Sequence, residues 1–344
     1  MPSATEWVAA LSPWPEEFGL DTMRALLDAV GNPERAFPSV HVVGTNGKST
    51  ATRTIAALLR GEGLDVGAYT SPHVSGWHER LDTDPETFER AVARVRQAAE
   101  AVGATQFETL TAAAFADFAE RTVDAAVVEA GLGGRLDATN VLDAPVVLLT
   151  NVGLEHTDVL GDTREKIAAE KLAVAGPKAT VVLPDDEWRG LVPGSRVVVG
   201  GAREAAGAFV GHAVPDEVEV SLPGRLERRG PDEVRDGAHT PEAVEWLLAR
   251  LEPRRWTIVA SVLRDKDVDT MLSRLAAAGP TLIATRSSNA RALDERDLAA
   301  RAERYFDHVD AVADPAAALA KAREHGPVLV TGSLYLLADL HDSR

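Results

Sequence analysis

The chain has 344 residues, which favours two domains, and its hydrophobic content of 45% and charged content of 26% are ordinary for a protein with a full core. Its net charge of −17 argues against non-specific binding to nucleic acid or to an anionic membrane, and its lack of cysteine excludes disulfides, thiolate metal sites and thiol nucleophiles. The first residues do not resemble a signal peptide, and no apolar stretch approaches the roughly 18 residues of a membrane span, so we expect a cytoplasmic protein.

Short runs rich in valine and leucine alternate with amphipathic stretches through the first two thirds of the chain. The predicted strands are Val40–Gly44, Val66–Tyr69, Ala125–Ala130, Val146–Asn151, Thr180–Leu183 and Val197–Val199. The predicted helices between them are Ser49–Gly61, Pro85–Val102, Leu110–Arg121 and Arg164–Val174. The nearly continuous apolar content of the strands suits a parallel sheet buried on both faces, so the pattern predicts a doubly wound, mostly parallel α/β domain. In such sheets ligands bind at the carboxyl ends of the strands.

A second alternating set follows Pro223 and predicts a smaller, Rossmann-like α/β domain. Its predicted elements are helix Pro241–Leu251, strand Trp256–Val262, helix Val268–Ala278, strand Thr281–Ala284, helices Glu295–Tyr305 and Pro315–His325, and strand Val328–Thr331. The interval Arg203–Ser221 has weak periodicity, and we place the junction near its end. The predicted domains are therefore residues 1–223 and 224–344.

A glycine-rich loop joins the first predicted strand to the first long helix. It consists of Gly44, Thr45, Asn46, Gly47, Lys48, Ser49 and Thr50. Glycines let backbone N–H groups approach phosphate oxygens, the helix N-terminus favours an anion, and a lysine supplies a positive charge. The spacing is shorter than that of the general P-loop, and the alternative is an ordinary glycine-rich turn. We interpret the loop as a phosphate cradle in which Ser49 or Thr50 offers an oxygen to Mg²⁺.

Further polar residues follow other predicted strands. Ser71 lies in Tyr-Thr-Ser-Pro-His after the second strand, where its hydroxyl could join a Mg²⁺ shell or form part of a Ser-Pro turn. Glu129 ends an apolar strand and begins a glycine-rich run to Asn140, which favours a cation ligand over a solvated strand end. His156 follows the next strand, and we favour a metal or phosphate contact there over a structural role.

Later charged motifs are less specific by themselves. Lys171, on a predicted amphipathic helix, would ordinarily be a solvated charge. Arg225 in Pro-Gly-Arg offers a guanidinium suited to phosphate. Asp236 and His239 lie in a glycine-containing turn before a helix, and the charged run 264–267 follows a strand.

Taken in order, these motifs resemble the folylpolyglutamate synthase and dihydrofolate synthase family of the Mur ligase superfamily. The shortened spacing of the cradle is characteristic of this family, and residues 127–140 form the most specific single signature. The resemblance spans most of the chain, through Phe18–Asp21, Gly31–Pro33, Gly44–Lys48, Tyr69–His73, Glu129–Asn140, Leu154–Gly161, Glu170–Lys171, Pro223–Arg225, Asp236–Pro241, Asp265–Asp267 and Thr331–Ser333.

The resemblance implies an ATP-dependent ligase that forms an acyl phosphate on a folate-type carboxylate and joins it to an amino acid, usually glutamate. Lys48 would hold the β- and γ-phosphates, Ser71 and Glu129 would bind one Mg²⁺, and His156 a second. Lys171 matches the family lysine that is often carbamylated. The nucleotide would also be reached by three residues of the second domain, namely Arg225, Asp236 and His239. We further expect a monomer or weak oligomer, and the net charge of −17 argues against a nucleic-acid or membrane partner.

The sequence departs from the family pattern at three places. Ser49 stands where the folate enzymes usually carry glycine, and Thr240 stands where asparagine is usual. No counterpart of the family's Gly-His-Gln segment is evident between Gly200 and Leu222. These departures leave two alternatives, a ligase of the same mechanism acting on a non-folate carboxylate and a nucleotide-binding relative without ligase turnover.

Overall fold

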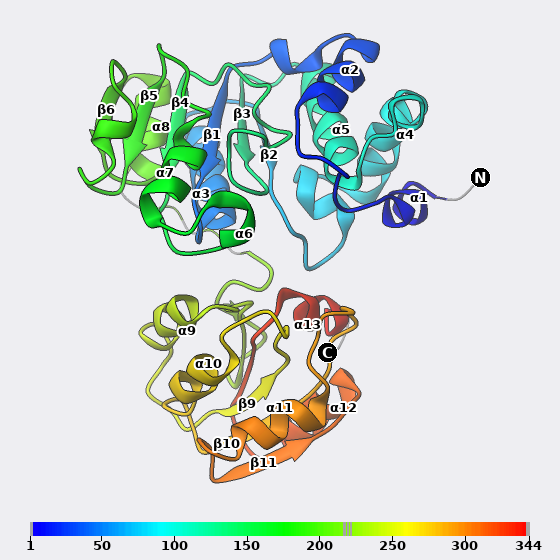
Figure 1. The fold of residues 1–344 in the computed structure, drawn as a ribbon, viewed down its shortest axis with the longest axis vertical. Coiled ribbons are helices and arrows are strands. Elements are labelled where there is room, and N and C mark those ends of the chain that lie inside the picture. Colours follow the sequence, from blue (N-terminus) through cyan, green and yellow to red (C-terminus); the bar gives the residue numbers. More distant parts are fainter. Residues whose placement is uncertain (1–2, 216–217, 219, 221, 342–344) are drawn as a thin grey trace. The chain divides into compact units, whose positions relative to one another are not determined.

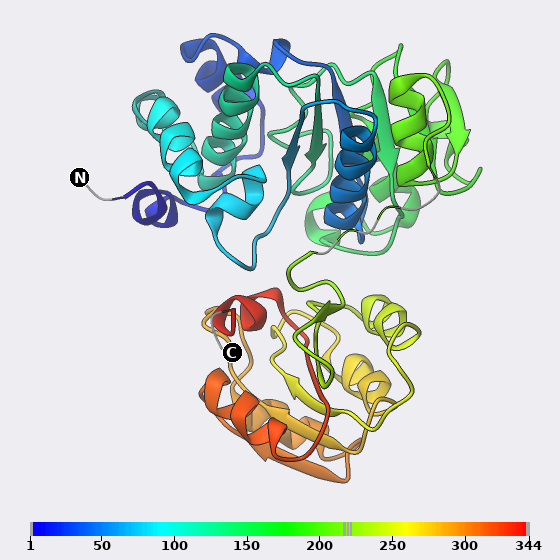
Figure 2. The ribbon, with the colours of Figure 1, turned by 180° about the vertical axis from the view of Figure 1, so that it is seen from behind.

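A computed structural model describes residues 3–215, 218, 220 and 222–341. The chain divides into two compact units, each a β-sheet with helices on both faces, seen from the two sides in Figures 1 and 2. The first unit contains Met1–Ser71 and Trp77–Val220, and the second contains Pro72–Gly76 and Ser221–Arg344. No helix within the described part of the chain is long and apolar enough to cross a membrane.

The first unit is built on a six-stranded sheet in the order β2-β3-β1-β4-β5-β6. All its neighbouring strands are parallel, and Val40 of β1 is paired with Val127 of β3 and Val146 of β4. The strands are β1 Ser39–Val43, β2 Val66–Tyr69, β3 Ala125–Glu129, β4 Val146–Leu149, β5 Thr180–Leu183 and β6 Arg196–Val199. Because all six run the same way, their carboxyl ends lie at one edge.

Helices cover both faces of this sheet. They are α1 Ala4–Ala10, α2 Asp21–Ala29, α3 Lys48–Gly61, α4 Pro85–Val102, α5 Gln106–Arg121, α6 Thr157–Leu160, α7 Arg164–Leu172 and α8 Ala202–Val210, with 3₁₀ turns η1 Pro33–Arg35, η2 Trp77–Leu81 and η3 Arg189–Leu191. Alternate residues of β1 point to opposite faces: Val40 and Val42 pack with α3 and α8, whereas Val43 packs with α7. The double burial explains why the inner strands β1, β3 and β4 are mostly apolar.

The second unit holds another six-stranded sheet, in the order β11-β10-β9-β12-β8-β7, in which only the β7–β8 pair is antiparallel. Its strands are β7 Glu227–Arg228, β8 Glu233–Arg235, β9 Thr257–Ala260, β10 Thr281–Ala284, β11 His308–Ala311 and β12 Val328–Thr331. Its helices are α9 Pro241–Leu248, α10 Val268–Leu275, α11 Glu295–Ala302, α12 Pro315–Arg323 and α13 Leu334–Asp339. Ile258 and Val259 of β9 pack into separate cores on the two faces.

The predicted fold class is confirmed, because both units are α/β and the first sheet is wholly parallel. The differences lie in short or atypical elements. Helix α5 begins at Gln106, before the predicted Leu110, because Thr105 and Glu108 form a capping box. Helix α8 lies in the interval of weak periodicity, where Ala205 and Ala206 are its buried residues. Strand β11 was not predicted, and its residues are exposed or half-buried, so it lacks the apolar run of a central strand.

Two glycines of the first unit give a paired test of this packing. Gly67 lies in β2, where an added Cβ would come within 2.5 Å of the buried Phe118 ring, whereas Gly61 ends α3 with open space around it. We expect Gly67→Ala to lower the free energy of unfolding by about 1–3 kcal/mol through overpacking. Gly61→Ala should raise it by up to about 1 kcal/mol because alanine favours the helix. Urea unfolding followed by circular dichroism measures both, and equal effects would contradict the packing of β2 on α5.

Candidate active site

The loop between β1 and α3 comes close to the segment that follows β4. Gly44 has a φ of 148° and an added Cβ would collide with the Thr150 side chain, so this position requires glycine. Asn151 accepts two backbone bonds from the loop, from Thr45 N to its carbonyl oxygen at 3.1 Å and from Asn46 N to its Oδ1 at 2.9 Å. The two strand ends are thereby joined into one rigid edge.

Lys48 begins α3 and folds back over the loop. Its Nζ donates to the carbonyl oxygens of Gly44 at 3.0 Å and Thr45 at 3.4 Å. Gly47, at φ 79°, is the residue before the helix, and the first N–H groups of an α-helix have no partner within it. The first turn of α3 therefore places an ammonium group and helix N-terminal amides at one place, as a phosphate requires.

Ser49, Ser71 and Glu129 come together from three elements. The Ser49 hydroxyl, in the first turn of α3, donates to Oε1 of Glu129 at 3.1 Å. The Ser71 backbone N–H, just after β2, donates to Oε2 of Glu129 at 3.0 Å. Glu129 ends β3 and only 2% of it is exposed. Two of the predicted metal ligands, Ser71 and Glu129, thus lie beside the glycine-rich loop.

This group of oxygen atoms fits Mg²⁺, which accepts one or two carboxylates and completes its shell with water and phosphate oxygens. Nowhere in residues 3–215, 218, 220 and 222–341 do three or more His, Cys, Asp or Glu side chains form a cluster that could hold a metal. These residues therefore give no all-protein cage at His156, which adopts a left-handed conformation at φ 44° before α6.

Lys171 is buried, unlike the solvated lysine that its helix pattern alone indicates. Only 1% of its side chain is exposed, and its Nζ donates to Glu155 Oε1 at 2.5 Å and to the Gly44 carbonyl at 3.0 Å. Burial lowers the pKa of Lys171, although Glu155 opposes the shift. Burial acts to raise the pKa of Glu155, but Lys171 and Lys48 outweigh it and hold that pKa below its ordinary value. Helix α7 thus supports the loop at Gly44.

The loop from Gly131 to Asn140 is organised by Asp137. Its Oδ2 accepts from Leu132 N at 2.7 Å, and its Oδ1 accepts from the backbone N–H and the hydroxyl of Thr139 at 3.0 and 2.5 Å. An added Cβ on Gly134 would meet the Lys171 carbonyl oxygen at 2.5 Å, so glycine lets this loop pack on α7. The signature motif therefore serves as a scaffold behind Glu129.

His41 is a buried residue that the sequence reasoning did not place in the site. Its Nε2 lies 2.8 Å from the Thr139 Oγ1. Because the single hydroxyl proton of Thr139 goes to Asp137, His41 Nε2 must carry a proton and donate it to Thr139. Complete burial lowers the pKa of His41 to about 4, so the ring is neutral. Its position inside the strand, with apolar neighbours, gave no signal of this role.

The predicted site residues of the second unit surround the turn after β8. Asp236 is buried and accepts from Leu226 N and Ala238 N, both at 2.8 Å, and burial raises its pKa. Arg225 NH1 donates to the Gly224 carbonyl at 3.0 Å, and His239 Nδ1 donates to that of Gly237 at 2.9 Å. Gly237 N donates to the Gly224 carbonyl at 2.9 Å, so the segment before β7 is held against the turn after β8.

Buried hydroxyls gather at the carboxyl edge of the second sheet. Thr331 ends β12, and Ser287 lies shortly after β10; both are at most 3% exposed, and their hydroxyl oxygens have no hydrogen-bond partner among the described residues. Ser261, just after β9, accepts from the Ser287 backbone N–H at 3.0 Å. Two buried hydroxyls at this edge thus have hydrogen-bonding capacity that the described residues do not use. The sequence reasoning noted only the motif at Thr331–Ser333.

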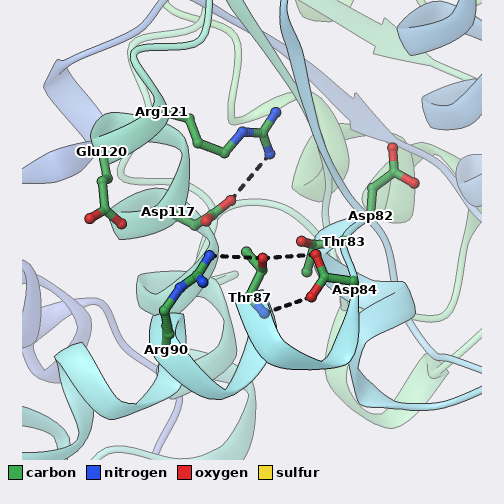
Figure 3. A pocket seen from close by; sticks show the side chains of 8 residues that line it. All are labelled: Asp82, Thr83, Asp84, Thr87, Arg90, Asp117, Glu120 and Arg121. Carbon is green, nitrogen blue, oxygen red and sulfur yellow. Dashed lines mark hydrogen bonds and ion pairs between the residues drawn. The ribbon is translucent and has the colours of Figure 1, made fainter.

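A surface hollow lies beside α4 and α5 of the first unit (Figure 3). Its lining consists of Asp82, Thr83, Asp84, Thr87, Arg90, Asp117, Glu120 and Arg121. The charged side chains already have partners, such as Arg121 for Asp117 and the helix-capping Thr87 N–H for Asp84. The charged side chains of the hollow are therefore committed to local partners, some of which lie outside its lining, and it contains none of the predicted site residues.

The fold and the contacts at the carboxyl edge of the first sheet, together with two family matches, define a Mur ligase. Residues 42–208 match the Mur ligase middle domain family, and residues 224–334 match the Mur ligase glutamate ligase domain family. The dihydrofolate synthase/folylpolyglutamate synthase of Mycobacterium tuberculosis H37Rv is 32% identical over 85% of this chain and 80% of its own length. The chain therefore belongs to the folylpolyglutamate synthase and dihydrofolate synthase family.

Another relative agrees with this family and is aligned over more positions than this chain has residues. The dihydrofolate synthase/folylpolyglutamate synthase of Bacillus subtilis 168 is 28% identical over 98% of this chain and 97% of its own length. That alignment spans 421 positions, so it contains gaps in this 344-residue chain, as expected for a shortened member.

Two solved structures share the fold over nearly the whole chain. The M. tuberculosis folylpolyglutamate synthase complexed with ADP has a TM-score of 0.87 at 27% identity, covering 98% of this chain and 96% of its own. The Yersinia pestis bifunctional enzyme complexed with AMPPNP and Mn ion has a TM-score of 0.83 at 25% identity, covering 99% and 98%.

The neutral His41 predicts a specific pH dependence of stability. Its folded pKa of about 4 lies below the ordinary 6.5, so the unfolded chain takes up a proton first and stability falls as pH drops from 6.5 towards 4. Because of this residue, the free energy of unfolding should fall by about 2 kcal/mol between pH 7 and pH 5. His41→Gln keeps a donor for Thr139 but does not titrate. Urea unfolding at pH 7 and pH 5 should therefore show that the variant loses about 2 kcal/mol less free energy of unfolding than the wild type. An equal loss in both proteins would mean that His41 titrates normally.

Proposed function

We propose that this chain is an ATP-dependent ligase that joins an amino acid, glutamate, to a carboxylate of a folate-type acceptor. The observation that carries the proposal is the group formed by Ser49, Ser71 and the buried Glu129 beside Lys48. The relatives named dihydrofolate synthase and folylpolyglutamate synthase support the choice of substrates.

The first unit would bind ATP. The β- and γ-phosphates would lie over Gly44–Thr50, held by the amides of the first turn of α3 and by Lys48, which would exchange its carbonyl contacts for phosphate oxygens. Ser71 and Glu129 would hold one Mg²⁺, which neutralises developing charge on the transferred phosphoryl group. His156 would serve a second Mg²⁺, shared with phosphate and water.

In the first step the acceptor's carboxylate oxygen attacks the γ-phosphorus, the bond from that phosphorus to the β–γ bridging oxygen breaks, and ADP leaves. The amino group of glutamate then attacks the carbonyl carbon of the acyl phosphate, releasing inorganic phosphate and a proton with formation of the amide. Lys48 and the loop amides orient the phosphate and balance its charge, which is the larger part of phosphoryl-transfer catalysis.

Lys171 would complete this environment from α7. Its lowered pKa and burial suit a reactive amine, and a carbamate formed on it would replace a cation by an anion beside Glu155. Two adjacent anions in a buried place require a cation between them. We therefore expect carbamylation and metal binding to accompany each other.

The predicted C-terminal domain, residues 224–344, would bind the amino acid. The predicted N-terminal domain, residues 1–223, would bind ATP. The unpartnered hydroxyls of Ser287 and Thr331 support a polar ligand at the edge of the second sheet. Arg225, from the segment before β7, and Asp236 and His239, from the turn after β8, would contact the nucleotide.

Incubation with Mg-ATP, dihydropteroate or a reduced folate, and glutamate should release phosphate only when acceptor and amino acid are both present, with the glutamylated product seen by mass spectrometry. Lys48→Met should lower kcat/KM for ATP by about 100- to 1,000-fold, the usual effect of removing one transition-state contact. Lys178→Met removes an exposed lysine in the α7–β5 connection and is the matched control, expected to match the wild type.

Each other outcome is informative. Turnover with a different carboxylate and none with pterin or folate acceptors would reject the folate-type acceptor while keeping the ligase chemistry. Binding of Mg-ATP without product from any acceptor would reject ligase activity. Equal activity of Lys48→Met and Lys178→Met would remove the role assigned to the loop.

A further inference from the structure

Helix α3 carries a second polar residue on the face that bears Ser49. Arg53 follows Ser49 by four residues, so the two side chains leave the same side of the helix one turn apart. Ser49 reaches Glu129, whereas the guanidinium of Arg53 reaches the chain that continues from β2. Only 12% of the Arg53 side chain is exposed, so its charge is committed to these contacts.

The guanidinium of Arg53 joins the end of β2 to the 3₁₀ turn η2. Its NH2 donates to the Glu79 carbonyl at 2.6 Å and to Thr70 Oγ1 at 3.5 Å, and its NH1 forms an ion pair with Asp82. Thr70 also donates from its backbone N–H to the Arg80 carbonyl at 2.9 Å. Thr70 is therefore fixed through both its side chain and its backbone.

Asp82 is the outer end of this network. It is not glycine yet has a φ of 51°, a conformation that persists only where the surroundings determine it. Arg60, two turns after Arg53 on α3, donates to Asp82 Oδ2 at 2.6 Å and to the Val66 carbonyl at 2.7 Å. Two arginines thus share one carboxylate, but Arg53 acts at the end of β2 and Arg60 at its beginning.

We infer that Arg53 is a positioning residue for the metal-binding edge, because it fixes Thr70 and thereby the backbone of Ser71. Ser71 follows Thr70 directly, and its N–H must lie 3.0 Å from Glu129 Oε2 while its carbonyl lies 3.5 Å from the Ser49 hydroxyl. The inference rests on the proposed function insofar as Ser71 and Glu129 bind the divalent ion. Under this inference Arg53 sets the relative positions of Ser71 and Glu129 and does not itself contact the substrate.

A competing role for Arg53 would be purely electrostatic. Burial lowers the pKa of Arg53, while Glu79 and Glu129 act in the opposite direction, so the guanidinium is close enough to Glu129 to influence it. If Arg53 only neutralised Glu129, its removal would leave more negative charge for a cation and would tighten metal binding. If Arg53 instead positions Ser71, its removal should weaken metal binding.

The test compares Arg53→Met with Arg60→Met, which removes the other arginine that holds Asp82. Binding of Mn²⁺ in the presence of AMPPNP is measured by electron paramagnetic resonance, and thermal unfolding is followed by circular dichroism. We expect Arg53→Met to raise the Mn²⁺ dissociation constant at least tenfold and Arg60→Met to change it less than twofold. Arg53→Lys keeps the positive charge but lacks the guanidinium fork, and we expect its Mn²⁺ binding to be weakened nearly as much as that of Arg53→Met.

Several results would overturn the inference. They are unchanged or tighter Mn²⁺ binding by folded Arg53→Met, equal weakening by Arg60→Met, and full retention of affinity by Arg53→Lys. If Arg53→Met does not fold, the folded Arg53→Lys decides by the same criterion. Failure of the wild type itself to bind Mn²⁺ with AMPPNP would refute the proposed function, and with it the premise of this inference.

Discussion

A carboxylate buried at the end of a strand is costly unless donors or cations surround it, and Glu129 is such a carboxylate. Its two oxygens are met by the Ser49 hydroxyl from α3 and the Ser71 N–H from the end of β2. Three elements are therefore held at one point. A divalent cation bound there would complete the compensation, which links the stability of this edge to the binding of a nucleotide.

The parallel sheet makes this convergence possible. Strands β2, β3, β1 and β4 are neighbours, so four connections leave from one edge. Gly44 brings the glycine-rich loop against Thr150. From α7, the Lys171 Nζ donates to the Gly44 carbonyl and so supports the same glycine. The loop is thus held on both sides, and under the proposed function this fixed shape would orient the phosphate that takes the place of the carbonyl contacts of Lys48.

The architecture and the residues of the edge could be predicted from the sequence, because apolar strands that end in glycine or polar residues are typical of the ligand-binding edge of a parallel sheet. Prediction failed where a role depends on a distant neighbour. His41 lies inside a strand and Arg53 inside a helix, and neither local pattern shows the hydrogen-bonded partners. Lys171 was placed in the site only by the family resemblance, since its burial arises from packing against Gly44 and Glu155.

The central claim is that this edge activates a carboxylate by phosphorylating it. The most direct measurement uses an acceptor whose reacting carboxylate carries ¹⁸O at both oxygens, followed by mass analysis of the phosphate released during turnover with ATP and glutamate. The account predicts that one labelled oxygen passes from the acceptor to each phosphate, because the acyl phosphate retains the attacking oxygen until the amine displaces it. Unlabelled phosphate, formed at the rate of amide synthesis, would contradict it.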